Sequence, residues 1–193
     1  MSTNGKAARP NWEKTFTSTT ADQTHALAAG LAAVLEAGDL LVLSGELGAG
    51  KTTFTQGLGE GLGVREGIIS PTFVLVRIHP NLPHGPRPGG PDLVHVDAYR
   101  LESAAEVDDI DLENTMDSSV TVVEWGRDRV EHLSESRLEI DLHRAMGLDA
   151  GRPSASLDFD TEDADEPRTI VLRGYGPRWP EAPELGASME GVR

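Results

Sequence analysis

One stretch of the sequence has the residue types and spacing that suit a phosphate group. The segment Gly45–Thr52, GELGAGKT, matches the pattern G-x-x-x-x-G-K-[ST] at every fixed position. Glycines let the backbone curl so that successive N–H groups face phosphate oxygens, and the following helix presents its partly positive N-terminus to the same anion. Lys51 suits the β- and γ-phosphates, and the Thr52 hydroxyl suits Mg²⁺. The sequence therefore predicts a nucleotide-binding P-loop, or Walker A motif.

Two short apolar segments further along the chain each end in an acidic residue. Leu93–Asp97 ends in Asp97, and Val120–Glu124 ends in Glu124. A P-loop commonly holds Mg²⁺ with its Ser or Thr and with an acid at the end of a nearby strand. In such folds ligands bind at the carboxyl ends of the strands, so either acid suits this role. The alternative is an ordinary strand-terminal acid that faces solvent.

Several other polar residues are weaker candidates. Thr72 lies in Ser70–Phe73, between the P-loop helix and the next strand, where a threonine can sense the γ-phosphate, although Ser-Pro also favours a simple turn. Gln23, by its position, is expected to line the base. The six histidines have no metal-ligand spacing: His95 is expected to pack inside a strand, and the loop histidines are expected to be solvated.

Apolar patterning predicts the elements that position these residues. Leu40–Leu43 is a continuous apolar run of the kind found in strands covered on both faces. The expected helices cover 23–35, 51–62 and 102–114, and the expected strands cover 14–18, 40–43, 73–78, 93–97, 120–123, 138–142 and 169–172. Strand 138–142 alternates apolar and charged residues, so we expect it near a sheet edge. The alternation of strands and helices predicts an α/β fold, a P-loop NTPase-type three-layer sandwich with a mostly parallel central sheet and additional antiparallel strands.

The length of 193 residues suits one domain. We expect it to cover 11–179, with a Pro- and Gly-rich loop insertion at 79–91 and an acidic flexible linker at 147–167. Residues 1–10 and 180–193 are expected to be disordered.

Composition limits the location and the partners. The chain has no cysteine, so a disulfide partner is excluded, and a reducing cytoplasm fits. No apolar stretch approaches the roughly 20 residues that span a bilayer, and residues 1–10 do not resemble a signal peptide. We therefore expect a cytoplasmic protein without a membrane partner. The net charge of −15 repels phosphate backbones, so tRNA would be reached only indirectly.

Four segments together resemble a known family. The P-loop with Thr53 and Phe54, the segment Ser70–Val76, the sequence HVDAYRL at His95–Leu101, and Val123–Trp125 occur in the order found in the TsaE family, which supports threonylcarbamoyl-adenosine modification of tRNA. The resemblance covers roughly residues 14–143.

The resemblance implies a weak ATPase that binds ATP and Mg²⁺ and associates with the TsaD and TsaB proteins. Because no arginine finger is placed by motif, we expect hydrolysis to be slow alone and to rise with these partners. Thr52 and Glu124 would ligate Mg²⁺, while Asp97 would act near the attacking water and serve with Lys51 and Glu124 in catalysis. The full set of expected nucleotide contacts is Gly45, Gly48, Ala49, Gly50, Lys51, Thr52, Thr53, Thr72 and Gln23.

Two other functions account for the same motifs. A P-loop small-molecule or nucleoside kinase would share the loop, the strands and the acids, although the sequence has no Arg-rich lid. A nucleotide-dependent binding module without significant catalysis would need only the loop. Hydrolysis assays with and without acceptors separate these alternatives.

Overall fold

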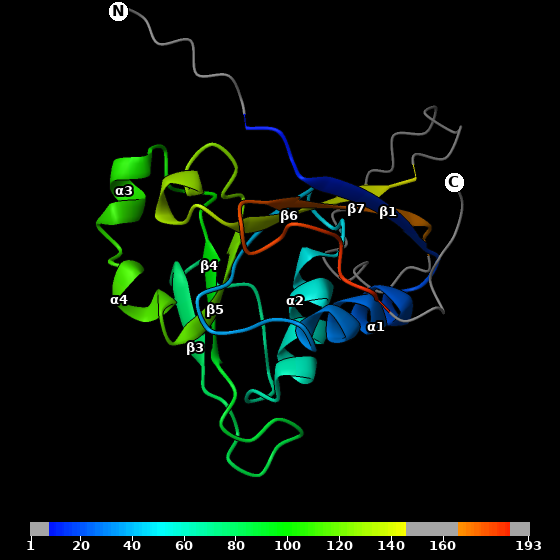
Figure 1. Ribbon diagram of the computed structural model, residues 1–193, viewed down its shortest axis with the longest axis horizontal. Helices are drawn as coiled ribbons and strands as arrows, with labels where there is room; N and C mark the ends of the chain where they lie inside the picture. Colours follow the sequence, from blue (N-terminus) through cyan, green and yellow to red (C-terminus); the bar gives the residue numbers. More distant parts are fainter. Residues whose placement is uncertain (1–7, 146–165, 186–193) are drawn as a thin grey trace, which may run out of the picture.

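The computed structural model describes residues 8–145 and 166–185. In this part of the chain seven strands form one sheet, with helices packed against it (Figure 1). The strands are β1 (Trp12–Ser18), β2 (Leu40–Ser44), β3 (Val76–His79), β4 (Asp92–Asp97), β5 (Ser119–Glu124), β6 (Arg137–Arg144) and β7 (Arg168–Tyr175). The helices are α1 (Ala21–Ala32), α2 (Lys51–Leu62), α3 (Ala104–Asp108), α4 (Glu113–Met116) and the 3-10 helix η1 (Glu131–Leu133). The expected segments 1–10, 147–167 and 180–193 lie mostly outside the described residues.

The sheet has a parallel centre and antiparallel flanks. Its strand order is β1-β7-β6-β2-β5-β4-β3. The four inner strands β6, β2, β5 and β4 pair in parallel. The pairs β1–β7, β7–β6 and β4–β3 are antiparallel. The α/β fold expected from the sequence is therefore confirmed.

Helices cover both faces of the sheet and make three layers (Figure 1). Strand β2 shows why, because its side chains alternate between two cores. Leu41 and Leu43 belong to the core that includes Leu31 of α1 and Phe54 of α2. Leu40 and Val42 belong to the opposite core, which includes residues of α3 and α4. Burial on both faces explains the uninterrupted apolar run of this strand.

Glycines in α2 let it lie close to α1. A Cβ added at Gly57 would sit 2.2 Å from the carbonyl oxygen of His25, and one added at Gly61 would sit 2.5 Å from that of Ala29. Real Cβ atoms do not approach backbone that closely, so these two positions require glycine. The close packing fixes α2, and with it the loop at the N-terminus of α2.

Two expected elements are shorter than their sequences suggested. The strand expected from Phe73 begins only at Val76, because the N–H groups of Val74 and Leu75 both donate to the carbonyl of Pro71 and close a turn. Leu75 has a left-handed φ of 65°. The helix expected over 102–114 is divided into α3 and α4, with Asp111 at φ 60° between them.

Strand β6 lies inside the sheet, so its expected place near an edge was wrong. It pairs with β2 on one side and with β7 on the other. Its acidic residues are buried and paired: Glu139 accepts a hydrogen bond from Arg137 at 2.9 Å, and Asp141 pairs with Arg127 and Arg173. Because these arginines neutralise the acidic side chains, a strand that alternates apolar and charged residues can lie inside the sheet.

The loop after β3 is attached to the helices at Asn81 and Arg87. The Asn81 side chain donates to the carbonyl of Leu62 at 2.9 Å, and Arg87 donates to the carbonyls of Ala32 and Leu35. His79 ends β3 and is buried, so the expectation that it is solvated was wrong. In the described part of the chain, no helix is long and apolar enough to cross a membrane.

Candidate functional site

The loop between β2 and α2 has a backbone that only glycine adopts easily. Gly45, Gly48 and Gly50 have φ values of 152°, 77° and 99°. A Cβ at Gly45 would also lie 2.4 Å from the carbonyl oxygen of Leu142. Gly50 is the N-cap of α2, and no side chain of the described residues caps this end of the helix. The first N–H groups of α2 therefore remain available to an anion.

A cavity of about 500 Å³ lies over this loop. Its lining combines loop residues with residues from the ends of β4 and β5 and from the segment before β3. The lining residues are Leu47, Gly48, Gly50, Lys51, Thr52, Thr53, Ser70, Thr72, Phe73, Asp97, Glu124 and Trp125. The structure thus brings Lys51, Thr52, Thr72, Asp97 and Glu124, which the sequence singled out separately, into one cavity.

Lys51 is buried and held by its own loop. Its Nζ donates to the carbonyl oxygens of Gly45 at 2.9 Å and Glu46 at 3.1 Å. The same atom lies 4.2 Å from the ring centre of Trp125, which allows a cation–π contact. Trp125 has a left-handed φ of 62°, uncommon for a residue with a bulky side chain. This strained turn directly after Glu124 brings an aromatic ring against the lysine.

Asp97 and Glu124 end neighbouring parallel strands in the same register. The hydroxyl of Thr72 donates to Asp97 Oδ2 at 2.8 Å, and the N–H of Tyr99 donates to Asp97 Oδ1 at 2.9 Å. Ser70 in turn contacts the Thr72 hydroxyl at 2.8 Å. Asp97 therefore links the sheet edge to the segment Ser70–Phe73.

Glu124 is paired with a buried histidine. His95 Nε2 lies 2.8 Å from Glu124 Oε1, and both side chains are almost fully buried. His95 sits one strand away on β4 and faces the same side of the sheet as Asp97. The sequence suggested only packing for His95, because nothing in one sequence shows that Glu124 lies beside it.

Glu46 ties the loop to the end of β6. Its Oε1 accepts a hydrogen bond from the N–H of Arg144 at 2.9 Å. Burial alone would raise the pKa of Glu46, but the backbone hydrogen bonds and the nearby positive charges of His143 and Arg144 outweigh it, so the pKa is lowered. The carboxylate therefore stays ionised and keeps the loop attached to β6.

The oxygen donors of the cavity fit a magnesium ion that is bound together with a phosphate. Thr52 supplies a hydroxyl, and Glu124 and Asp97 supply carboxylates. In the described part of the chain no three acidic or histidine side chains gather into a complete metal centre. Mg²⁺ commonly takes one or two protein oxygens and completes its shell with phosphate oxygens and water. The hydroxyl of Thr52 and the carboxylates of Glu124 and Asp97 form a donor set of this incomplete kind.

Comparison with known proteins gives a consistent result. The family model described as "Threonylcarbamoyl adenosine biosynthesis protein TsaE" matches residues 18–151. A Streptomyces coelicolor protein named tRNA threonylcarbamoyladenosine biosynthesis protein TsaE is 50% identical over 153 residues, which cover 79% of this chain and 90% of that protein. The protein of that name from Mycobacterium tuberculosis is 41% identical over 151 residues, which cover 75% of this chain and 82% of that protein.

The chain belongs to the TsaE family.

A solved structure extends this similarity to the fold. The crystal structure of YdiB from Bacillus subtilis superposes with a TM-score of 0.61 at 28% identity, covering 87% of this chain and 89% of that one. The segment matched by the TsaE model contains the P-loop, Thr72 and both strand-end acids. Strand β7 lies outside the matched segment.

Arg168 of β7 is a residue that sequence reasoning missed. Its side chain is 3% exposed and packs against the P-loop, since a Cβ added at Gly50 would lie 3.4 Å from Arg168 Nε. Nothing in the sequence marks this residue, because more than a hundred positions separate it from Gly50. Gln23, by contrast, is not among the residues lining the cavity, and its side chain accepts hydrogen bonds from Thr19. A contact between Gln23 and the base stays a prediction.

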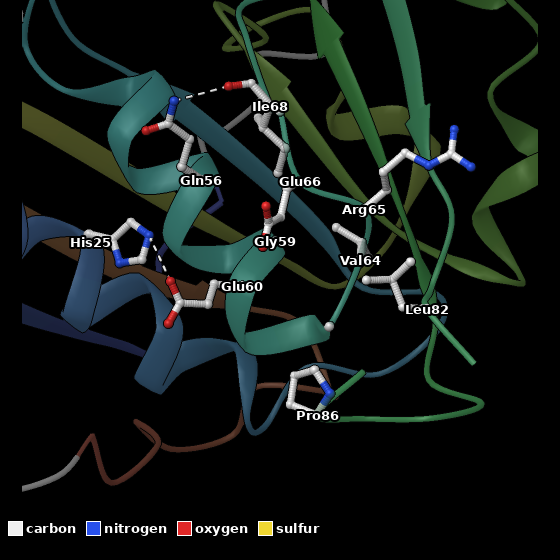
Figure 2. A pocket seen from close by; sticks show the side chains of 12 residues that line it. His25, Gln56, Gly59, Glu60, Val64, Arg65, Glu66, Ile68, Leu82 and Pro86 are labelled. Atoms are coloured by element: carbon white, nitrogen blue, oxygen red, sulfur yellow. Dashed lines mark hydrogen bonds and ion pairs between the residues drawn. The ribbon is translucent and has the colours of Figure 1, made fainter. Parts of the chain in front are cut away.

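A second cavity of about 400 Å³ lies at the C-terminal half of α2 (Figure 2). Three of its polar side chains already have partners. His25 pairs with Glu60 at 3.2 Å, and Gln56 donates to the carbonyl of Ile68 at 3.0 Å, as Figure 2 shows. Neither the P-loop nor the strand-end acids contribute to its lining.

Proposed function

We propose that this protein binds Mg-ATP in the cavity over Gly45–Thr52 and hydrolyses it slowly in support of threonylcarbamoyl-adenosine modification of tRNA. One observation carries the proposal: the P-loop, Thr52, Asp97 and Glu124 converge on a single cavity. Related TsaE proteins are named for the biosynthesis of this nucleoside. By the same resemblance, TsaB and TsaD are the proposed partners.

The loop residues would hold the phosphates. The uncapped N–H groups at the start of α2 face the cavity, and Lys51 supplies a positive charge to the β- and γ-phosphates. Thr52 and Glu124 are the proposed Mg²⁺ ligands. Bound Mg²⁺ would neutralise charge on the phosphates. Lys51 would have to exchange its bonds to the Gly45 and Glu46 carbonyls for phosphate oxygens.

Asp97 is the proposed water-positioning group. Both of its oxygens already accept hydrogen bonds, from Thr72 and from the Tyr99 N–H, so the carboxylate has a fixed orientation. A fixed carboxylate can orient a water for attack on the γ-phosphate and accept its proton. Because Thr72 contacts Asp97, the segment Ser70–Phe73 would respond to what occupies the cavity.

Large apolar side chains at the mouth of the cavity support a protein partner. Phe73 is 87% exposed and Leu47 is 83% exposed, and both line the cavity. Tyr99 is also exposed and stacks edge-on against Trp125. Exposed apolar groups close to a functional site are typical of surfaces that a protein covers.

The first test is ATP binding by Lys51→Ala. We expect the variant to lose most of its ATP affinity in calorimetry, because it lacks the only basic side chain among the residues lining the cavity. The Lys14→Ala variant, at a half-buried position in β1 that does not line the cavity, is the matched control and should bind as the parent does. Unchanged affinity in Lys51→Ala would sink the P-loop assignment. Phosphate transfer to a small-molecule acceptor that exceeds hydrolysis would instead identify a kinase.

A further inference from the structure

Behind Glu124, two buried histidines and the half-buried Arg77 each have a buried polar atom that finds no hydrogen-bond partner among the described residues. The atoms are Arg77 Nε, His79 Nε2 and His95 Nδ1. His95 is fully buried, and His79 is 7% exposed. Polar groups this deeply buried are nearly always hydrogen-bonded to protein or to water. These atoms come from residues on the paired strands β3 and β4, so one shared partner can satisfy them.

The antiparallel register of β3 and β4 places these side chains on one face. Arg77 lies opposite His95, and His79 lies opposite Leu93. Residues opposite one another in an antiparallel pair point to the same side of the sheet. Leu93 belongs to the core that contains Phe54 of α2, so this is the face beneath the P-loop helix. The rings of His79 and His95 have centroids 6.5 Å apart, a separation that suits one bridging water.

The contact with Glu124 assigns the tautomer of His95. An ionised carboxylate only accepts hydrogen bonds, so the proton of a neutral His95 must be on Nε2, which faces Glu124 Oε1 at 2.8 Å. Nδ1 is then an acceptor and needs a donor. Arg77 Nε carries an unused N–H, and His79 Nε2 can carry another. The unsatisfied donors and the unsatisfied acceptor match.

The charges of Arg77, His79 and Glu124 are consistent with this assignment of donors and acceptor. Burial, together with the positive charge of Arg77, lowers the pKa of His79, so that ring stays neutral. Arg77 forms no ion pair with a carboxylate in the described part of the chain. A neutral imidazole between a cation and a carboxylate transmits polarisation in one direction, from Arg77 towards Glu124.

We propose that Arg77, His79 and His95 form a buried, water-bridged hydrogen-bond chain that fixes the Nε2–H tautomer of His95 and so aims Glu124 into the nucleotide cavity. His95 is thus a positioning residue for Glu124. The inference rests on the proposed Mg-nucleotide site, because it explains how Glu124 keeps one oxygen in place while the other faces the ligand. A histidine behind a ligating group changes metal affinity without touching the metal.

The tautomer can be measured without any activity. Long-range ¹H–¹⁵N correlation spectra of the histidine rings in the nucleotide-free protein should show the His95 proton on Nε2 and a hydrogen-bonded, unprotonated Nδ1. The exposed His84 should show the mixture of tautomers typical of a solvated ring. A His95 ring protonated only at Nδ1 would overturn the proposal.

The second experiment measures the Mg²⁺ dependence of nucleotide binding. His95→Leu removes the donor to Glu124, and His95→Gln keeps a donor at the position of Nε2. We expect His95→Leu to need about ten-fold more Mg²⁺ for half-maximal stimulation of ATP binding, with Mg²⁺-free binding changed less than two-fold. His95→Gln should recover most of the loss, and His84→Leu should match the parent. Thermal melting of each variant shows whether it is folded.

A double-mutant cycle separates this inference from the proposed function. In a Glu124→Ala background, His95→Leu should add no further loss, because His95 acts through Glu124. An equal loss in both backgrounds would overturn the positioning role. If the parent itself binds ATP without any Mg²⁺ dependence, the proposed metal site fails. If the parent and Glu124→Ala differ in Mg²⁺ dependence while His95→Leu behaves as the parent, only the present inference fails.

Discussion

At the residue scale, the polar side chains of the cavity hold one another in position. Asp97 is fixed by Thr72 and by the Tyr99 N–H, Glu124 is fixed by His95, and Lys51 is fixed by loop carbonyls. Such contacts cost side-chain entropy at folding rather than at ligand binding. The cavity is therefore largely organised before a nucleotide enters, and only Lys51 must exchange partners.

Asp97→Asn tests the role of the carboxylate. Asparagine keeps the shape: its amide oxygen can still accept from the Tyr99 N–H, and its NH2 group can donate to the Thr72 hydroxyl, which reverses that bond. The charge that would orient and deprotonate a water is lost, and such groups act mainly in the transition state. We expect ATP hydrolysis to fall by about a hundred-fold, with ATP affinity within a few-fold of the parent. Asp117→Asn, at an exposed position after α4, is the control. A large loss of affinity with normal turnover would make Asp97 a ground-state ligand.

The sequence predicted most of this constellation because its signals are local. The P-loop pattern lies within eight residues, and Asp97 and Glu124 follow short apolar strands whose ends meet at one edge of a parallel sheet. The partner of Glu124 could not be predicted, because the contact with His95 depends on which strands are neighbours. The same holds for Arg168, which reaches Gly50 from the last strand.

At the scale of elements, the contact between α1 and α2 positions the P-loop. Gly57 and Gly61 of α2 face backbone carbonyls of α1 at distances that leave no room for a Cβ. At Gly30 of α1, no heavy atom in residues 8–145 and 166–185 lies within 4 Å of such a Cβ. Glycine is therefore required at Gly57 and Gly61 of α2, whereas position 30 of α1 has room for a larger side chain.

Gly57→Ala and Gly30→Ala are expected to change stability in opposite directions. The Gly57 methyl would meet the His25 carbonyl at 2.2 Å and push the helices apart, with an expected loss of about 2–3 kcal/mol in the free energy of unfolding. Alanine at Gly30 fits and favours the helix, with an expected gain of about 0.5–1 kcal/mol. Urea denaturation measures both values. Equal stability of the two variants would contradict the close packing of α1 on α2.

The loop after β3 stabilises the end of α1 through Arg87. α1 has no basic residue in its last turn, and the guanidinium of Arg87 donates to the carbonyls of Ala32 at 3.1 Å and Leu35 at 2.8 Å. These carbonyls lie at the negative end of the helix dipole, where a cation is favourable. The loop, expected from its composition to be merely exposed, supplies the cation that the last turn of α1 lacks.

Arg87→Ala is therefore expected to lower stability by about 1–2 kcal/mol, because two charge-assisted hydrogen bonds are lost. His84→Ala, at an exposed position in the same loop, should change it by less than about 0.5 kcal/mol. Thermal or urea unfolding of both variants makes the comparison. Equal effects would show that Arg87 contributes no more than a solvated loop residue.

The elements that the sequence could not place are those set by distant contacts. The apolar runs of β2, β4 and β5 predicted their positions, because burial on both faces leaves a clear pattern. The interior place of β6 depends on Arg127 and Arg173, which neutralise Asp141 from other elements. The turns at Leu75 and Asp111 have left-handed φ values at non-glycine residues, for which the sequence has no signal.

At the scale of the whole molecule, charge and exposed apolar surface point to the same kind of partner. The net charge of −15 opposes close contact with a polyanion such as tRNA. The mouth of the cavity nevertheless carries the exposed apolar side chains Leu47 and Phe73. A protein surface can cover these groups, and RNA chemistry would then be reached through that protein.

The last prediction follows from the charges around the cavity. Lys51 is the only basic side chain among its lining residues, and Arg100 of the family signature lies over the Phe73 ring at 5.4 Å. Charge that develops on the γ-phosphate in the transition state would then be incompletely neutralised, and a missing arginine can be worth roughly a thousand-fold in rate. A partner that contacts Leu47 and Phe73 could supply the missing cation or order the segment Ser70–Phe73.

We therefore expect slow steady-state ATP hydrolysis by the purified chain and a clear increase on adding the TsaB–TsaD pair from the same cell. The pair with Lys51→Ala is the control and should show no increase, which assigns the hydrolysis to this chain. Fast turnover by the chain alone, unchanged by the pair, would favour a self-sufficient enzyme.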